Sequence, residues 1–170
     1  EVYGEKFFKN YVKMMENWPD FQKEDERWNF DAVMLSHFLA PQALFLELYH
    51  SPEWALAHLD GQSALFLKNK PEFSFVIQKF QIDFQKEFKS LEPAGVGPAL
   101  LAREKFNLGR LLLMMEQFDY ARKEFEEGIN LEPENMDFNF YLGSTLNLLL
   151  RYRDALAYLE KVAAKQPDFV

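Results

Sequence analysis

The sequence predicts an all-α fold in which antiparallel helical hairpins stack on one another behind an N-terminal helical part that is rich in Phe. The first observation is a repeat, because residues in the last third of the chain recur at a fixed offset of 34. The second is that apolar residues between the prolines recur every three to four positions, as amphipathic helices require. The repeated pairs are Phe106 and Phe140, Leu108 and Leu142, Gly109 and Gly143, Leu112 and Leu146, Ala121 and Ala155, Glu126 and Glu160, and Pro133 and Pro167.

The elements in the first 50 residues follow from this spacing. An apolar stripe over residues 3–18 predicts a helix that ends before a proline. Residues 20–27 are polar and acidic and predict a solvated loop, whereas residues 28–39 return to helical spacing. A further helix is predicted to start at Pro41 and to run through Tyr49.

The middle of the chain is also predicted to be helical. A helix start at Pro52, which follows a capping Ser, leads into residues 54–67. Residues 72–91 alternate locally as a strand would, but their length and lack of glycine favour a long and largely buried helix. Leu-Glu-Pro at 91–93 recurs at 131–133, near the end of the first repeat, but at a spacing of 40 and not 34. Either residues 52–93 form a degenerate helical pair of the same kind, or the tripeptide is a chance match at a helix end.

The clearest break lies at residues 93–98, where two prolines flank two glycines. It separates an N-terminal helical part, residues 1–93, from residues 98–170, which contain the repeat. A chain of 170 residues with 48% hydrophobic content is long and apolar enough for a full core. We therefore expect both parts to share one continuous compact domain.

Phe is unusually frequent, with 18 residues, of which 12 lie before residue 90. Phe is among the residues that are most often buried, so most of these rings are expected inside. The alternative is an exposed aromatic surface that a partner covers.

The charge balance limits the class of partner. The net charge of −8 would repel a phosphate backbone, so no nucleic acid is expected. Glu47, Glu116 and Arg151 interrupt the most apolar stretches before they reach the length of a membrane span, which predicts a soluble chain without membrane insertion. The absence of Cys fits reducing and oxidising compartments alike. A cytoplasmic location is favoured, and export stays open because the first residue is not Met.

The repeat resembles two tandem tetratricopeptide units, at residues 102–135 and 136–169, because Gly, Ala and Pro match twice in register at the period of that family. The resemblance implies a short right-handed superhelix of helix-turn-helix units that holds another protein. One departure is that the usual Trp near the start of each unit is Lys105 and Asn139. Another is Val162, where a small residue is usual.

In that family the first helices of successive units line a groove that selects a peptide or helix of a partner. Members that clamp a C-terminal carboxylate carry Lys and Asn where this chain has Phe106 and Arg110, so the resemblance implies an aromatic groove with basic edges. Phe106 and Phe140 then face either a partner or the chain's own N-terminal helices. The implied groove positions are Arg103, Phe106, Asn107, Arg110, Leu113, Asp137, Phe140, Tyr141, Ser144 and Asn147.

Two units are fewer than the three or so that a stable solenoid needs, so the ends require cover. The N-terminal helices are expected to cap the first unit. The last helix should lack a neighbour on one side, which predicts a homodimer, a docked partner or a chain cut from a longer protein, and we favour the homodimer. The residues expected on this end surface are Leu156, Leu159, Val162 and Ala163.

No motif predicts catalysis, a cofactor or a metal site. Glu47 and His50 form a Glu-x-x-His step, but a di-iron or di-manganese site needs a second such step, and neither His37 nor His58 supplies one. The glycines near residue 96 lack the rest of a phosphate-binding loop. Two functions remain: a non-enzymatic interaction module, either a scaffold or adaptor or a chaperone-like protein, and a structural or assembly subunit of a larger complex.

Overall fold

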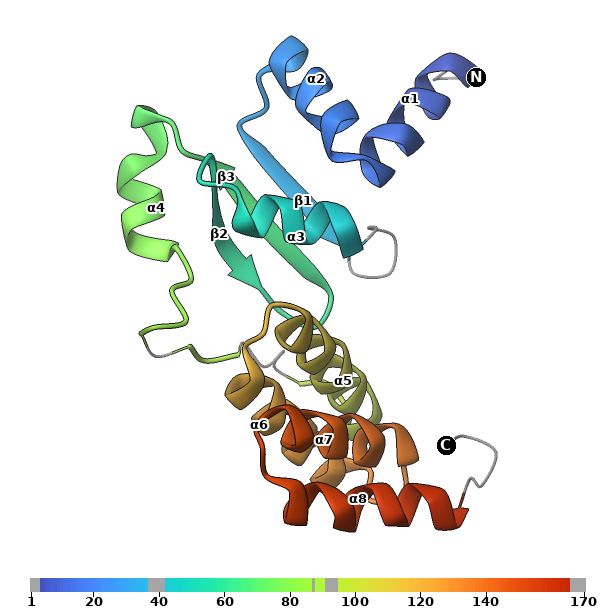
Figure 1. The fold of residues 1–170 in the computed structure, drawn as a ribbon. Coiled ribbons are helices and arrows are strands. Elements are labelled where there is room, and N and C mark those ends of the chain that lie inside the picture. The colour runs from blue at the N-terminus through green and yellow to red at the C-terminus, as the bar shows by residue number, and fades with distance from the viewer. Residues whose placement is uncertain (1–3, 37–41, 87, 91–94, 166–170) are drawn as a thin grey trace. The chain divides into compact units, whose positions relative to one another are not determined.

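The computed structural model describes residues 4–36, 42–86, 88–90 and 95–165 (Figure 1). The chain divides into two compact units. The first contains Glu1–Leu59 and Ser63–Asp83, and the second contains Asp60–Gln62 and Phe84–Val170. The fold is mostly helical, but the first unit contains a three-stranded antiparallel sheet, so the strictly all-α prediction is wrong there.

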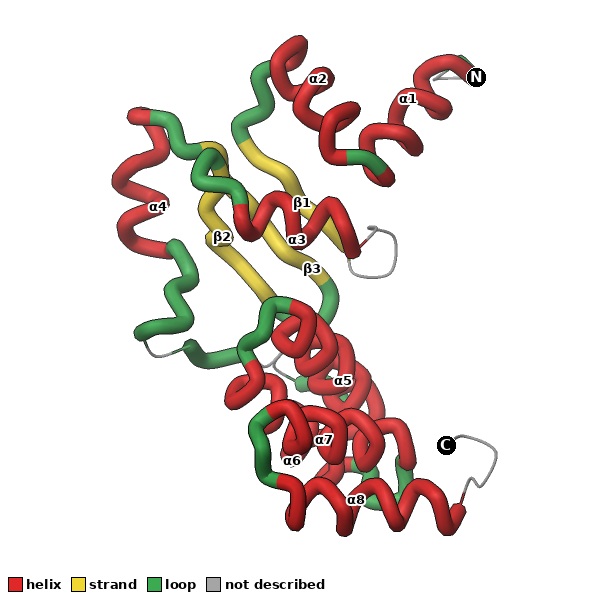
Figure 2. Tube along the Cα trace, viewed as in Figure 1, coloured by secondary structure: helices red, strands yellow, loops and turns green. Residues whose placement is uncertain are grey.

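The sheet of the first unit has the order β1-β3-β2, with β3 in the middle (Figure 2). Its core face carries Leu35 from β1, Leu56 from β2 and Phe66 from β3, each at most 4% exposed. Phe66 lies opposite both Val33 and Leu56 in the register. The strands are β1 (Ala32–Ser36), β2 (Trp54–Leu59) and β3 (Ser63–Lys68).

These strands replace two predicted helices, over residues 28–39 and 54–67, and they rule out a degenerate helical pair over residues 52–93. Short apolar runs fit the helical and the strand period equally well, so the spacing alone could not distinguish strands from helices here. The deciding local signal is Asp60-Gly61, a typical hairpin dipeptide, where the Asp60 carboxylate accepts a hydrogen bond from the Gln62 N–H at 2.8 Å. Residues 37–39 lie outside the described residues.

The helices of the first unit agree with the sequence in part. A helix within residues 3–18 is confirmed as α1, although Trp18 already belongs to α2, and the helix predicted from Pro41 through Tyr49 is confirmed as α3. Tyr3 and Pro41 are outside the described residues. The predicted loop over residues 20–27 is instead α2, which has Asn17 as its N-cap, a proline in its first turn and a buried Phe21. The bounds are α1 (Glu5–Glu16), α2 (Trp18–Trp28) and α3 (Gln42–His50).

The long buried helix predicted over residues 72–91 is also wrong where the structure describes it, and residues 87 and 91 are outside the described residues. A 3₁₀ turn, Pro71–Phe73, leads into the short helix α4 (Ser74–Phe80), of which Ile77 alone is buried. The chain then leaves the helix, and the Ile82 N–H donates to the Leu56 carbonyl of β2 at 2.8 Å. In the second unit, Phe84 and Phe88 pack on the ring of Tyr120, with centroids 5.7 and 5.5 Å away.

The second unit contains two helical hairpins, and a short turn joins the two helices of each hairpin (Figure 1). Both turns have the same geometry at an offset of 34: Glu116 and Leu150 each adopt φ 59°. The following N–H groups of Gln117 and Arg151 donate back to Leu112 and Leu146 at 2.8 and 2.9 Å. The helices are α5 (Pro98–Met114), α6 (Phe118–Leu131), α7 (Met136–Leu148) and α8 (Tyr152–Lys165).

The repeated glycines lie where two helices cross. A Cβ atom on Gly109 would come within 2.5 Å of the Phe125 ring, and one on Gly143 would come within 2.8 Å of Leu159, which stands 34 residues after Phe125. Ala121 and Ala155, the other repeated small residues, are at most 3% exposed. The helix–helix contacts of the first hairpin therefore recur in the second hairpin, 34 residues later.

Candidate functional site

Four of the predicted groove residues come together on α5 and α7: Phe106, Arg110, Phe140 and Tyr141, which we call the α5–α7 aromatic surface. The rings of Phe106 and Tyr141 meet edge to face, with centroids 5.2 Å apart, and Phe140 packs on Tyr141 at 5.5 Å. The Arg110 guanidinium lies 5.8 Å from the centroid of Phe106 and 5.7 Å from that of Tyr141. It therefore makes a cation–π contact with both rings.

The inner side of this surface rests on buried rings of the same unit. Phe106 contacts Phe138 with centroids 5.4 Å apart, and Tyr141 contacts Phe125 at 5.5 Å. Phe125 and Phe138 are 0% and 1% exposed, whereas Phe106 and Tyr141 are half-buried. Each of these two rings thus packs on a buried ring and is itself partly exposed.

The other groove positions are spread around these four residues. Asn107 is turned inward, where its side chain donates to the Gly61 carbonyl at 3.1 Å. Arg103 is exposed, and Leu113 is half-buried. On α7, Asp137 and Asn147 are exposed, and Ser144 is half-buried.

The predicted end surface differs from its expected membership. Val162 is 1% exposed and belongs to the core, and Leu159 is half-buried because it packs beside Gly143. Ala163 is half-buried, and Leu156 is 56% exposed. Leu156 is one of four exposed apolar residues at or near the α7–α8 turn. We call these four residues the turn patch, and each is at least 50% exposed: Leu148, Leu150, Tyr152 and Leu156.

Lys105 and Asn139, the two positions at which the resemblance leads one to expect Trp, are polar and buried. The Lys105 ammonium is 3.2 Å from the Glu124 carboxylate and 2.5 Å from that of Glu127. Burial raises the pKa of Glu124 above its ordinary 4.5, and the charge of Lys105 acts in the opposite direction. The Asn139 side chain donates to the Asn135 carbonyl at 2.9 Å. The ion pairs of Lys105 thus link α5 to α6.

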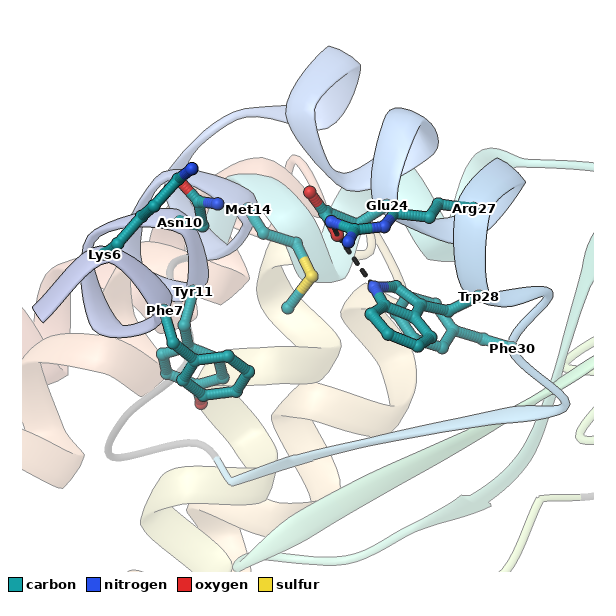
Figure 3. A pocket seen from close by; sticks show the side chains of 9 residues that line it. All are labelled: Lys6, Phe7, Asn10, Tyr11, Met14, Glu24, Arg27, Trp28 and Phe30. Atoms are coloured by element: carbon teal, nitrogen blue, oxygen red, sulfur yellow. Dashed lines mark hydrogen bonds and ion pairs between the residues drawn. The ribbon is translucent and has the colours of Figure 1, made fainter. Parts of the chain in front are cut away.

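The first unit contains a pocket of about 590 Å³ that the sequence analysis did not predict (Figure 3). Figure 3 shows aromatic rings of α1 on one side of it and Trp28 and Phe30 on the other. The Trp28 indole N–H donates to the Glu24 carboxylate at 2.9 Å, and the Arg27 guanidinium lies 4.8 Å from the centroid of the Trp28 ring. The lining residues are Lys6, Phe7, Asn10, Tyr11, Met14, Glu24, Arg27, Trp28 and Phe30.

A second hollow of about 350 Å³ adjoins this pocket, sharing Tyr11, Met14 and Phe30 with it. It follows the whole of β1, with Tyr11, Met14 and Met15 of α1 opposite. We call the two hollows together the α1–β1 cleft. The apolar stripe of α1 was visible in the sequence, but the strand that forms the other wall was not predicted, so the cleft could not be predicted either.

Comparisons with protein-family models, with curated proteins and with solved structures found no match to this chain. Within the described residues, no helix has the length and apolar character needed to cross a membrane. In that same part of the chain, no three His, Cys, Asp or Glu side chains gather in a way that could hold a metal ion.

Proposed function

We propose that this chain is a non-catalytic protein-interaction module of the tetratricopeptide kind, in which α5–α8 hold a peptide or helix of a partner on the α5–α7 aromatic surface. The observation that supports this most is Arg110, which lies over two half-exposed rings that buried rings hold in place. Anchored aromatic and Arg side chains are the groups that dominate protein interfaces. A scaffold, adaptor or chaperone-like role follows from such a surface.

The chemistry of the surface limits the partner segment. The rings of Phe106, Phe140 and Tyr141 would contact an apolar side chain, and Arg103 and Arg110 would attract a carboxylate beside it. We therefore propose a partner segment with an apolar anchor and at least one acidic residue nearby, bound as a helix or as an extended peptide.

The repeated packing supports the family assignment within this proposal. The αL turns at Glu116 and Leu150, and the glycine contacts at Gly109 and Gly143, recur at the offset of 34 that the tetratricopeptide family has.

A second candidate function is a structural or assembly subunit, which the turn patch favours. Four large apolar side chains that are each at least half exposed would be covered in a larger complex. The free protein separates the two functions. A soluble and cooperatively folded chain supports the module, whereas aggregation or molten behaviour without partners supports the subunit.

The test of the module is affinity capture from the source organism with the chain as bait, followed by mass spectrometry, using the Arg110→Ala variant beside the parent. We expect the parent to retain a partner that the variant loses, with unchanged helicity, because Arg110 is exposed and its removal leaves the buried rings in place. Arg153→Ala, an exposed arginine on α8, is the matched control and should retain the partner. If Arg110→Ala and Arg153→Ala captured the same proteins as the parent, the aromatic surface would not be the binding site.

A further inference from the structure

The outer edge of β1 presents backbone hydrogen-bonding groups in a regular row. The Lys68 N–H donates to the Asp31 carbonyl at 2.9 Å. Asp31, which directly precedes β1, and Lys68 of β3 are therefore a hydrogen-bonded pair of the antiparallel ladder. Because such pairs alternate along antiparallel strands, Val33 and Leu35 also bond to β3. The N–H and C=O groups of the alternate residues of β1 therefore point away from β3.

The two edges of the sheet differ. At the outer edge of β2, the Leu56 carbonyl accepts a hydrogen bond from the Ile82 N–H. No backbone hydrogen bond joins the outer edge of β1 to any other described residue. The sequence of β1, Ala-Val-Met-Leu-Ser, has no charge and no proline, which are the usual devices that keep an edge strand from pairing.

The α1–β1 cleft lies along this edge and is apolar. Met34 on β1 is 75% exposed, and Tyr11 on α1 is 45% exposed. The hollow of about 350 Å³ touches every residue of β1 and continues into the pocket beside Trp28, where the indole ring is 61% exposed. An extended chain beside β1 would thus have backbone partners along the strand and apolar walls for its side chains.

The charges in the cleft favour an acidic group. Two cations, Lys6 and Arg27, line the pocket against a single carboxylate, Glu24. That carboxylate already accepts from the Trp28 indole N–H and lies 3.7 Å from the Arg27 guanidinium. The cleft thus carries an excess of positive charge in a chain whose net charge is −8.

We propose that the α1–β1 cleft binds an extended segment of another protein, which adds to β1 as a fourth strand. Its apolar side chains, at every second position, enter the cleft, and an acidic side chain lies near Lys6 and Arg27. A second copy of this chain fits less well, because it would bring the same basic rim and the same apolar α1 to the cleft. This site is independent of the α5–α7 aromatic surface, since all its residues belong to the first unit.

The test measures binding of a fluorescent synthetic peptide to the whole chain by anisotropy. The peptide has about eight residues, with Val or Ile at every second position, Thr between them and Asp at one end. Saturable binding is expected, and the Met34→Pro variant should bind at least about tenfold more weakly, because it loses an outward N–H. Proline at this edge position removes no bond to β3, and Met34→Val is the control that keeps the N–H.

A second arm leaves the protein unchanged. The same peptide with methyl groups on alternate backbone nitrogens should bind at least about tenfold more weakly, and one with Lys in place of Asp should also lose affinity. Equal binding of the methylated peptide, equal binding by Met34→Pro, or no binding of the parent peptide at millimolar concentration would overturn the proposal. A dimer of the parent chain that Met34→Pro dissociates would also overturn it, by assigning the edge to a second copy.

Discussion

At the scale of single residues, two helix glycines of the second unit, Gly109 and Gly128, make room for buried aromatic rings. Gly109 faces Phe125 and Gly128 faces Phe138, and these two rings are 0% and 1% exposed. Gly143 differs, because the atom nearest to its missing side chain is the end of the Leu159 side chain, which is only half-buried. The same substitution at these sites should therefore have unequal effects.

We expect Gly128→Ala to destabilise the chain, because a Cβ there would lie 2.0 Å from the Phe138 ring. Overpacking of this kind costs about 1–3 kcal/mol, against roughly 1 kcal/mol that Ala gains over Gly in a helix. Gly143→Ala should cost less, since Leu159 can rotate. Urea unfolding of both variants measures the difference. Equal stability of Gly128→Ala and Gly143→Ala would show that α6 and α7 pack differently at this crossing.

The buried Glu124, in the ion cluster with Lys105 and Glu127, makes the stability of the chain depend on pH, and the direction of its pKa shift fixes the sign of that dependence. A carboxyl whose pKa is higher in the folded than in the unfolded chain binds more protons when folded, so its contribution to stability falls as the pH rises. Burial raises the pKa of Glu124 above 4.5. Its contribution is thus complete below pH 4.5 and is lost as the pH rises from 4.5 through the folded-state pKa.

The Glu124→Gln variant removes this titration while Glu127 still neutralises Lys105. We expect the variant to gain stability relative to the parent as the pH is raised from 4.5 toward neutrality. Chemical unfolding at several pH values measures the difference, and Glu126→Gln, whose partner is Arg122 on the helix surface, is the control. A difference that stays constant or shrinks with pH would contradict the sign.

At the scale of elements, both hairpins of the second unit end their first helix with a residue that is not glycine in the left-handed region. Glu116 and Leu150 have φ 59°, and the hydrogen bonds that follow them are those of a Schellman C-cap. Glycine is usual at this position because other residues strain the backbone there. Each turn therefore stores strain that a glycine would relieve.

Glu116→Gly should raise the free energy of unfolding by about 0.5–1 kcal/mol, because the strain relieved exceeds the added flexibility of the unfolded chain. Glu116 is exposed and its side chain has no role in the core, so nothing offsets this gain. A glycine in the middle of a helix should have the opposite effect, so Lys123→Gly, at an exposed position of α6, should destabilise the chain by about 1 kcal/mol. Thermal unfolding of both variants tests the pair, and a destabilised Glu116→Gly would show that the turn does not adopt this geometry.

The elements also show why prediction from the sequence was better in the second unit than in the first. The helices there rest on contacts within one hairpin, so small residues such as Gly109 and Ala121 repeat with the packing that requires them. In the first unit, the strands β1 and β3 pair across about 30 residues of sequence, and their apolar runs are too short to distinguish the two periods. The α1–β1 cleft depends on that pairing, so sequence spacing alone could not reveal it, whereas Asp60-Gly61 could have revealed the hairpin.

At the scale of the whole molecule, the chain has two units, and each contains one of the two binding surfaces proposed above. The α5–α7 aromatic surface is built from two helices of the second unit, and the α1–β1 cleft from a helix and a strand edge of the first. The two sites differ in chemistry, because one offers side chains alone and the other also offers backbone groups. The two proposals together imply a chain that binds two different segments, as a scaffold does.

The turn patch leaves a third surface, for which we expect self-association. A closed dimer would cover Leu150 and Leu156, which are 71% and 56% exposed, through a two-fold contact of the same patch on both copies. Because each copy carries a charge of −8, association should strengthen when salt rises from low concentration to about 0.15 M, where charges beyond about 8 Å are screened. We expect sedimentation velocity at micromolar concentration to show a dimer, and Leu156→Glu to shift it to the monomer. Asn130→Glu, which adds the same charge at an exposed position of α6, should leave the dimer intact. A parent chain that stays monomeric at all salt concentrations, while well folded, would leave the turn patch to a different protein.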